Sequence, residues 1–261
     1  MSDLEDDQNP VLIQAQSRRG VSTPAPTPLL LFHDGGGTLF SYFLLEPLGR
    51  DVSGFADPRA ESERPWQGGI LEMAEYYYDC MKAAMRPGPV LLGGWSFGGH
   101  LALQLAHIIS SDSLGGFEVA GIIMIDSSCP LGERYTSKDG GEHTIPFKED
   151  VPVHMRKVAQ ASMDRTVRML AQWNPPTWPT GSSGPPRALL LRAQESVDQR
   201  NQRSPKLDWE LYPHDFIESV TPIPGNHFNL FEVGNVSILS AALREGCKQL
   251  EKFYRNIPSR T

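Results

Sequence analysis

The chain has few cysteines and no long hydrophobic run, and these two shortages limit the classes of protein to which it can belong. Its three cysteines, Cys80, Cys129 and Cys247, are too few and too scattered for a disulfide framework or a zinc site. A reducing compartment is therefore expected, and the cytoplasm is the simplest choice. No apolar stretch approaches the ~18 residues that a membrane helix requires. We therefore expect no membrane partner.

Basic residues are also in the minority. The chain has 24 lysines and arginines against 31 aspartates and glutamates, a formal net charge of −7, and no basic block that could follow a phosphate backbone. Nucleic acid is therefore not an expected partner. The first residues are acidic where a signal peptide would be basic. We expect residues 1–9 to be a disordered tail and residues 10–261 to form one domain.

Strands and helices alternate along most of the chain. Short apolar runs predict strands over residues 11–14, 29–32, 51–55, 89–92, 119–126, 187–193 and 216–223. Apolar residues at helical spacing predict helices over residues 40–48, 69–85, 98–110, 151–173 and 235–257. This order predicts an α/β fold with a mostly parallel sheet and helices on both faces. Between Ser127 and Pro186 the alternation stops, and we expect a lid insertion over about residues 131–186.

A Gly-x-Ser-x-Gly pentapeptide, Gly94-Trp95-Ser96-Phe97-Gly98, stands between a predicted strand and a predicted helix. A strand that turns this tightly into a helix holds the serine in a strained conformation, and small residues on both sides let the segments cross. The first helical turn also favours negative charge. The context predicts a nucleophile at Ser96, with the amides of the first helical turn beside it as donors to an oxyanion.

A serine nucleophile needs a base, and the chain offers a histidine in a suitable turn. His227 lies in Pro224-Gly225-Asn226-His227-Phe228, after the last predicted strand and before the final helix, where the base of this kind of site belongs. His214 is the weaker alternative. The other histidines that follow the serine are expected in packing, surface or lid positions: His100, His107, His143 and His154.

The base in turn needs an acid, and two strand ends offer one. Asp126 ends a strongly apolar strand, and a carboxylate at this edge of the sheet indicates a role other than packing. Asp198, with Glu195 nearby, follows a later strand but lies in a polar run that is typical of a solvated loop. We favour Asp126 and keep Asp198 as the alternative.

Four segments together resemble the thioesterase domains that release products from polyketide synthases and nonribosomal peptide synthetases, especially the fungal polyketide type. They are Leu29 to Thr38, Gly93 to Gly99, Met124 to Pro130, and Pro224 to Phe228. The resemblance implies an α/β-hydrolase fold and a Ser-His-Asp triad of Ser96, His227 and Asp126. Stand-alone editing relatives use the later acid, which would correspond to a position near Asp198.

The resemblance also implies a second oxyanion donor in the turn after the first core strand. This donor would be an amide near Asp34, Gly35 or Gly36, beside the amide of Phe97. The turn has neither the Gly-x-Gly-x-x-Gly spacing nor the lysine of a phosphate-binding loop. We expect no cofactor and no metal.

The implied function is a hydrolase of polyketide biosynthesis in secondary metabolism. Ser96 attacks an acyl thioester on the phosphopantetheine arm of an acyl carrier protein, and water or an internal hydroxyl then releases the chain from the acyl-enzyme as an acid or a lactone. Because the chain carries no carrier or ketosynthase region, it either acts in trans or is part of a larger protein, and of the two we favour a free-standing enzyme. The alternatives are an esterase, lactonase or amide hydrolase with the same triad, and a catalytically silent binding relative.

The expected lid carries several large apolar residues. They either cover the acyl chain or form the core of the insertion itself. These residues are Met155, Met163, Met169, Trp173 and Trp178.

Overall fold

The computed structural model describes residues 9–16, 25–62, 64–132, 152–179, 182–197 and 204–256. Seven strands form one sheet within these residues: β1 (Val11–Gln14), β2 (Leu29–Phe32), β3 (Val52–Phe55), β4 (Gly88–Trp95), β5 (Phe117–Ile125), β6 (Ala188–Ala193) and β7 (Ile217–Ile223). Their order is β1-β3-β2-β4-β5-β6-β7, with β1 antiparallel to β3 and all other neighbours parallel. The expected mostly parallel sheet is confirmed.

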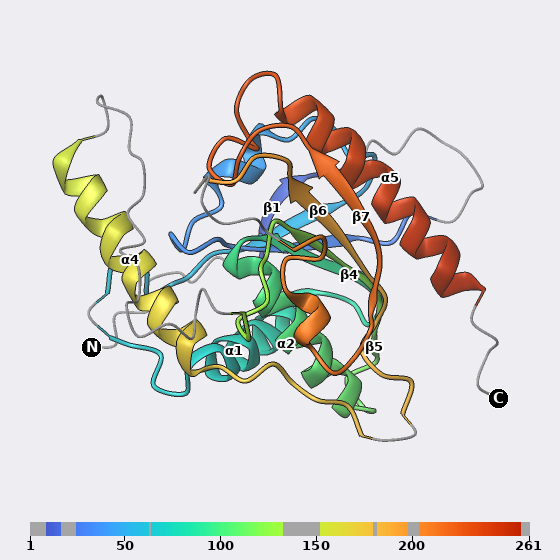
Figure 1. Cartoon of the computed structure of the whole chain (residues 1–261). Helices are drawn as coiled ribbons and strands as arrows, with labels where there is room; N and C mark the ends of the chain where they lie inside the picture. Colours follow the sequence, from blue (N-terminus) through green and yellow to red (C-terminus); the bar gives the residue numbers. More distant parts are fainter. Residues whose placement is uncertain are drawn as a thin grey trace.

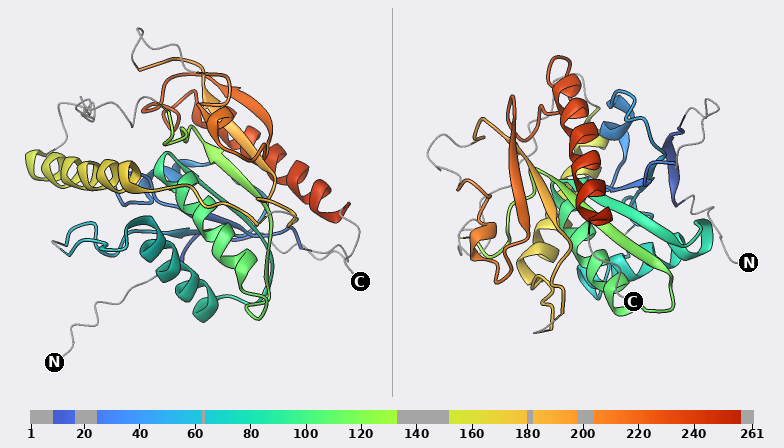
Figure 2. Two further views of the ribbon diagram at one scale, coloured as in Figure 1. Left: turned by 60° about the horizontal axis from the view of Figure 1, so that its bottom comes forward. Right: turned by 90° about the vertical axis from the view of Figure 1, so that its right-hand side faces the viewer.

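Helices cover both faces of the sheet (Figure 1). The α-helices of the described residues are α1 (Gly69–Ala84), α2 (Phe97–Ser111), α4 (Val153–Gln172) and α5 (Val236–Arg255). Figure 2 shows α1 and α2 on one face and α5 on the other. Each face has its own apolar core, one of which includes residues of α1, α2 and the end of α4, and the other residues of α5. This double coverage explains why the central strands are apolar on both sides.

The strand order determines which segments meet at the carboxyl edge of the sheet. Strand β4 lies between β2 and β5, so the turn after β2, the elbow after β4 and the residue after β5 are direct neighbours. Strand β6 separates β5 from β7. The segment after β7 must therefore reach back across the end of β6 to meet the elbow.

The helix expected over residues 40–48 is wrong. Only a short 3₁₀ segment, η1 (Phe40–Leu44), forms there, and the backbone becomes extended at Leu45. A proline at position 47 disfavours helical backbone in the residue before it, which explains the early end. Phe40 is 73% exposed, whereas Tyr42 is buried. Phe43 and Leu44 are exposed as well, whereas Leu48 is buried.

The other predicted elements agree with the structure to within a few residues. Helix α2 begins at Phe97 and α4 spans Val153–Gln172. Residues 1–8 of the expected tail and residues 133–151 of the expected lid lie outside the described residues. Asn9 is fastened to Ala56 after β3, because its side-chain amide donates to the carbonyl and its side-chain oxygen accepts from the amide, each at 2.9 Å.

Candidate active site

The segment that joins β4 to α2 is a sharp elbow with Ser96 at its tip. Ser96 has φ 56° and ψ −115°, and its amide donates to the Ile125 carbonyl at 2.8 Å. A Cβ atom at Gly94 would lie 2.6 Å from the Cα of Gly98, and one at Gly98 would collide with the carbonyl oxygen of Phe32. Glycine is therefore required at both positions for the strand and helix to cross.

The structure brings Ser96, His227 and Asp126 together. Nε2 of His227 lies 3.1 Å from Oγ of Ser96, and Nδ1 lies 2.8 Å from Oδ2 of Asp126. A carboxylate can only accept, so Nδ1 carries the ring proton and Nε2 is free to accept the serine proton. Two hydrogen bonds therefore connect the three residues in a continuous chain, from a buried carboxylate through an imidazole to a hydroxyl.

Asp126 is held firmly in this position. It directly follows β5, has φ 50° and is 1% exposed. Its Oδ1 accepts the amide of Ala193 at 2.9 Å, and its own amide donates to the carbonyl of Leu191 at 2.8 Å. Since both partners belong to β6, the neighbouring strand fixes the carboxylate that orients His227.

The glycine-rich turn after β2 lies beside the elbow. The amide of Gly36 donates to Oδ1 of Asp34 at 2.9 Å, and the amide of Gly37 donates to the Asp34 carbonyl at 3.1 Å. Among the described residues, none accepts a hydrogen bond from the amides of Gly35 or Phe97. Of the three amides considered for the turn, that of Gly36 is therefore engaged within the turn, and that of Gly35 has no acceptor among the described residues.

The Asp34 carboxyl also affects the charge of the site. Burial raises the pKa of Asp34, while the His33 ring and the Gly36 amide lower it by less. The carboxyl of Asp34 therefore binds a proton at a higher pH than a solvated aspartate does.

Tyr42 is a site-supporting residue that the sequence did not indicate. Its hydroxyl donates to the carbonyl of Phe32 at 2.6 Å and accepts the amide of Trp95 at 2.7 Å. Burial raises the pKa of Tyr42 far above its usual value, so the hydroxyl keeps its proton. Tyr42 thus ties the residue before the glycine-rich turn to the residue before Ser96. No sequence signal pointed to this bond, because it depends on how η1 packs under the sheet edge.

The alternative histidines have other partners. His100 is buried, Nε2 bonds the Ser128 carbonyl at 2.7 Å, and burial lowers the pKa of His100 to about 4. Nε2 of His214 accepts the amide of Trp178 at 3.3 Å. His107 packs its ring against Trp178, and His154 is exposed on α4. His143 and Asp198 lie outside the described residues.

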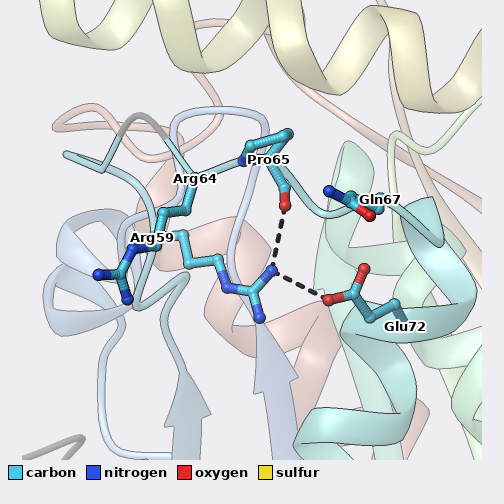
Figure 3. Close-up of a pocket in the computed structure, with 5 residues that line it drawn as sticks. All are labelled: Arg59, Arg64, Pro65, Gln67 and Glu72. Carbon is cyan, nitrogen blue, oxygen red and sulfur yellow. Dashed lines mark hydrogen bonds and ion pairs between the residues drawn. The ribbon is translucent and has the colours of Figure 1, made fainter.

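A cavity of about 450 Å³ opens near the start of α1, and Ser96, Asp126 and His227 do not line it (Figure 3). Its lining residues are Arg59, Arg64, Pro65, Gln67 and Glu72. The Arg59 guanidinium donates to Oε1 of Glu72 at 3.0 Å and to the Pro65 carbonyl at 3.2 Å. In the part of the chain that the structure describes, no group of three or more His, Cys, Asp or Glu residues could hold a metal. No helix in that part is long and apolar enough to cross a membrane.

The order serine, aspartate, histidine along the chain, with the serine on a strand–turn–helix elbow, is typical of the α/β-hydrolases. The chain has this α/β-hydrolase fold. Residues 27–243 match the family model described as Thioesterase domain, and the chain belongs to this family. It is a thioesterase, and so a hydrolase.

Named relatives agree with this assignment. The chain is 58% identical over 260 residues to the protein described as Thioesterase AMT4 from Alternaria alternata, and the match covers 99% of both chains. It is 34% identical over 282 residues to Probable thioesterase gloN from Glarea lozoyensis, covering 94% of this chain and 98% of the relative.

Solved structures show the same fold. The NocB thioesterase domain from the nocardicin cluster superposes with a TM-score of 0.66 at 24% identity and covers 86% of this chain and 95% of the domain. A covalent complex of that domain with a fluorophosphonate nocardicin G analog superposes with a TM-score of 0.62 at 26% identity, covering 84% and 94%.

Proposed function

We propose that Ser96, His227 and Asp126 are the catalytic triad of a thioesterase that releases a polyketide-like acyl chain from a carrier protein. The observation that carries the proposal is this chain of two hydrogen bonds, which measure 2.8 Å from Oδ2 of Asp126 to Nδ1 of His227 and 3.1 Å from Nε2 of His227 to Oγ of Ser96. Both distances lie within the reach that proton transfer requires.

The reaction has two steps. Oγ of Ser96 attacks the thioester carbonyl carbon while Nε2 of His227 takes the hydroxyl proton, and the C–S bond then breaks as His227 returns that proton to the leaving thiolate. Water, or a hydroxyl of the acyl chain, next attacks the acyl-enzyme with His227 again as the base. The product is an acid or a lactone, and Ser96 regains its proton.

The oxyanion of each tetrahedral intermediate needs donors that are already in place. We assign this role to the amides of Phe97 and Gly35, neither of which donates to a described residue. Phe97 is the first residue of α2, so the helix N-terminus adds a favourable dipole.

Two observations support the substrate class. The relatives named above are thioesterases, and the structural neighbour is a thioesterase domain from a biosynthetic cluster. We infer that the acyl group arrives on the phosphopantetheine thioester of an acyl carrier protein, which acts as the partner.

The test is intact-protein mass spectrometry after incubation with a panel of acyl-pantetheine thioesters and the matching oxygen esters. We expect an adduct of acyl mass on the native protein and none on Ser96→Ala. Ser111→Ala, at the exposed end of the same helix, is the matched control and keeps the adduct. Turnover by Ser96→Ala at the native rate contradicts the proposal. Preference for oxygen esters over thioesters supports the esterase alternative instead.

A comparison of two substrates tests the carrier protein as the partner. An acyl chain on a carrier protein is expected to react with a higher kcat/KM than the same chain on free pantetheine, because the carrier adds binding energy outside the reacting group. Equal values for the two substrates contradict the carrier as partner while leaving the triad intact.

A further inference from the structure

Helix α4 makes a direct hydrogen bond to the glycine-rich turn. Thr166 is only 4% exposed, and its Oγ1 donates to the Gly35 carbonyl at 3.2 Å. A Cβ atom at Gly35 would lie 2.9 Å from Sδ of Met163 and 3.5 Å from Cγ2 of Thr166. The helix therefore packs against the backbone of Gly35 through the side chains of Met163 and Thr166.

The Thr166 hydrogen bond completes the fixation of one peptide group. The carbonyl of Gly35 and the amide of Gly36 belong to the same planar unit. Thr166 holds its oxygen, and Oδ1 of Asp34 holds its N–H at 2.9 Å. Because glycine has few backbone restrictions, these two bonds limit the rotation of the peptide that follows Gly35, while the amide of Gly37 and Nδ1 of His33 hold the Asp34 carbonyl of the peptide that precedes it. The amide on the other side of Gly35 is the one that we assign to the oxyanion.

The part of α4 that carries Thr166 is the part fastened to the body of the protein. Arg165 donates to the carbonyl of Ser62 at 2.8 Å and also to that of Ala60, and Leu170 is buried in the core shared with α1 and α2. Just beyond the helix, Nε1 of Trp173 donates to Gln104 at 2.8 Å. In Figure 1 this end of α4 lies against the body, and the first half extends away from it.

We propose that Thr166 is a positioning residue, which sets the direction of the Gly35 amide and so couples the seating of α4 to the acyl-transfer step. The proposal rests on the proposed function of Ser96 and Gly35. The hydrogen bond from α4 holds the peptide after Gly35 at its oxygen, and its loss leaves that peptide held only at its N–H.

The test compares three variants on the full chain. Thr166→Val keeps the shape but removes the hydroxyl, whereas Thr166→Ser keeps the hydroxyl. The control is Ser162→Ala, one turn earlier on the same face of α4, buried like Thr166 but without a hydrogen bond to the turn. Rates are measured with a short acetyl thioester and are divided by the number of sites titrated with a fluorophosphonate, so that misfolded protein does not count.

A misdirected donor costs less than a deleted one, so we expect Thr166→Val to lower kcat about tenfold and KM to stay within about twofold. Thr166→Ser and the control are expected to keep kcat within about twofold of the native value. A merely structural role lowers the melting temperature but leaves the rate per titrated site unchanged. The proposal is refuted by an unchanged kcat in Thr166→Val, by a loss confined to KM, or by Thr166→Ser being equally impaired.

Hydrogen exchange separates this proposal from the function on which it rests. The amides of residues 34–38 are expected to exchange faster in Thr166→Val than in Thr166→Ser, whether or not the protein turns over thioesters. If Ser96→Ala keeps thioester turnover, the proposed function fails, but the exchange rates still report on the turn. Equal exchange in the two variants overturns the role of Thr166.

Discussion

The change Asp126→Asn tests the acid of the proposed triad by replacing one carboxylate oxygen with an NH₂ group of similar size. The native carboxylate accepts from Nδ1 of His227 at 2.8 Å and from the amide of Ala193 at 2.9 Å. An asparagine has only one oxygen. The backbone amide of Ala193 cannot change from donor to acceptor, so the oxygen stays there and the NH₂ group faces His227.

The imidazole then has to accept at Nδ1 and carry its proton on Nε2, the nitrogen that faces Ser96. In this tautomer it cannot take the serine proton. We expect kcat to fall by about 10⁴-fold, a barrier increase of about 5.5 kcal/mol. The free energy of unfolding changes much less, because Ala193 and His227 both keep partners in the variant.

The assay is single-turnover acylation from an acyl-pantetheine thioester, with circular dichroism and urea unfolding to verify the fold. Asp198→Asn is the matched control and is expected to keep its rate within about twofold. A loss smaller than about tenfold in Asp126→Asn refutes the tautomer argument. A crippled Asp198→Asn variant instead assigns the acid to the later position that editing relatives use.

Three further changes follow from the structure. Tyr42→Phe leaves the amide of Trp95 and the carbonyl of Phe32 without their shared partner. We therefore expect the free energy of unfolding in urea to fall by about 2 kcal/mol and kcat to fall as well. Native values for both contradict the bridging role. Gly98→Ala places a methyl group against the Phe32 carbonyl and is expected to abolish fluorophosphonate labelling, whereas labelling at the native rate contradicts the close crossing. The folded-state pKa of His100, about 4, lies below its unfolded value near 6.5, so the unfolded state binds more protons between these two pH values. The free energy of unfolding therefore falls by up to roughly 3 kcal/mol as the pH drops from about 6.5 to 4. His100→Gln is expected to reduce this pH dependence in urea titrations, and an unchanged dependence contradicts the assignment to His100.

Much of the fold was predictable because its signals are local. The apolar run Leu29–Phe32 and the glycines around Ser96 are required by the strand and the turn in which they lie, so each can be recognised without knowledge of distant contacts. The structure contains both elements. His227 was also found from its turn alone. The structure brings it within bonding distance of Ser96 and Asp126, and the catalytic role of the three remains the proposal made above.

The features that were missed all depend on contacts between distant segments. Thr166 and Gly35 are 131 residues apart, and neither residue type is unusual where it stands. Tyr42 meets Trp95 only because β2 and β4 are neighbours, and it lies in a segment that was expected to be helical and is not. Periodicity can report which side of an element is apolar, but it cannot report which partner that side meets.

The left-handed backbone of Ser96 and Asp126 implies an opposition between stability and activity. Both are non-glycine residues with positive φ, at 56° and 50°, and such conformations cost on the order of 1–3 kcal/mol each. Ser96→Gly is therefore expected to melt at a higher temperature than Ser96→Ala, although both lack the proposed nucleophile. If Ser96 has the proposed role, the variant that relieves this backbone strain is inactive, and selection for thermal stability alone favours loss of the catalytic serine.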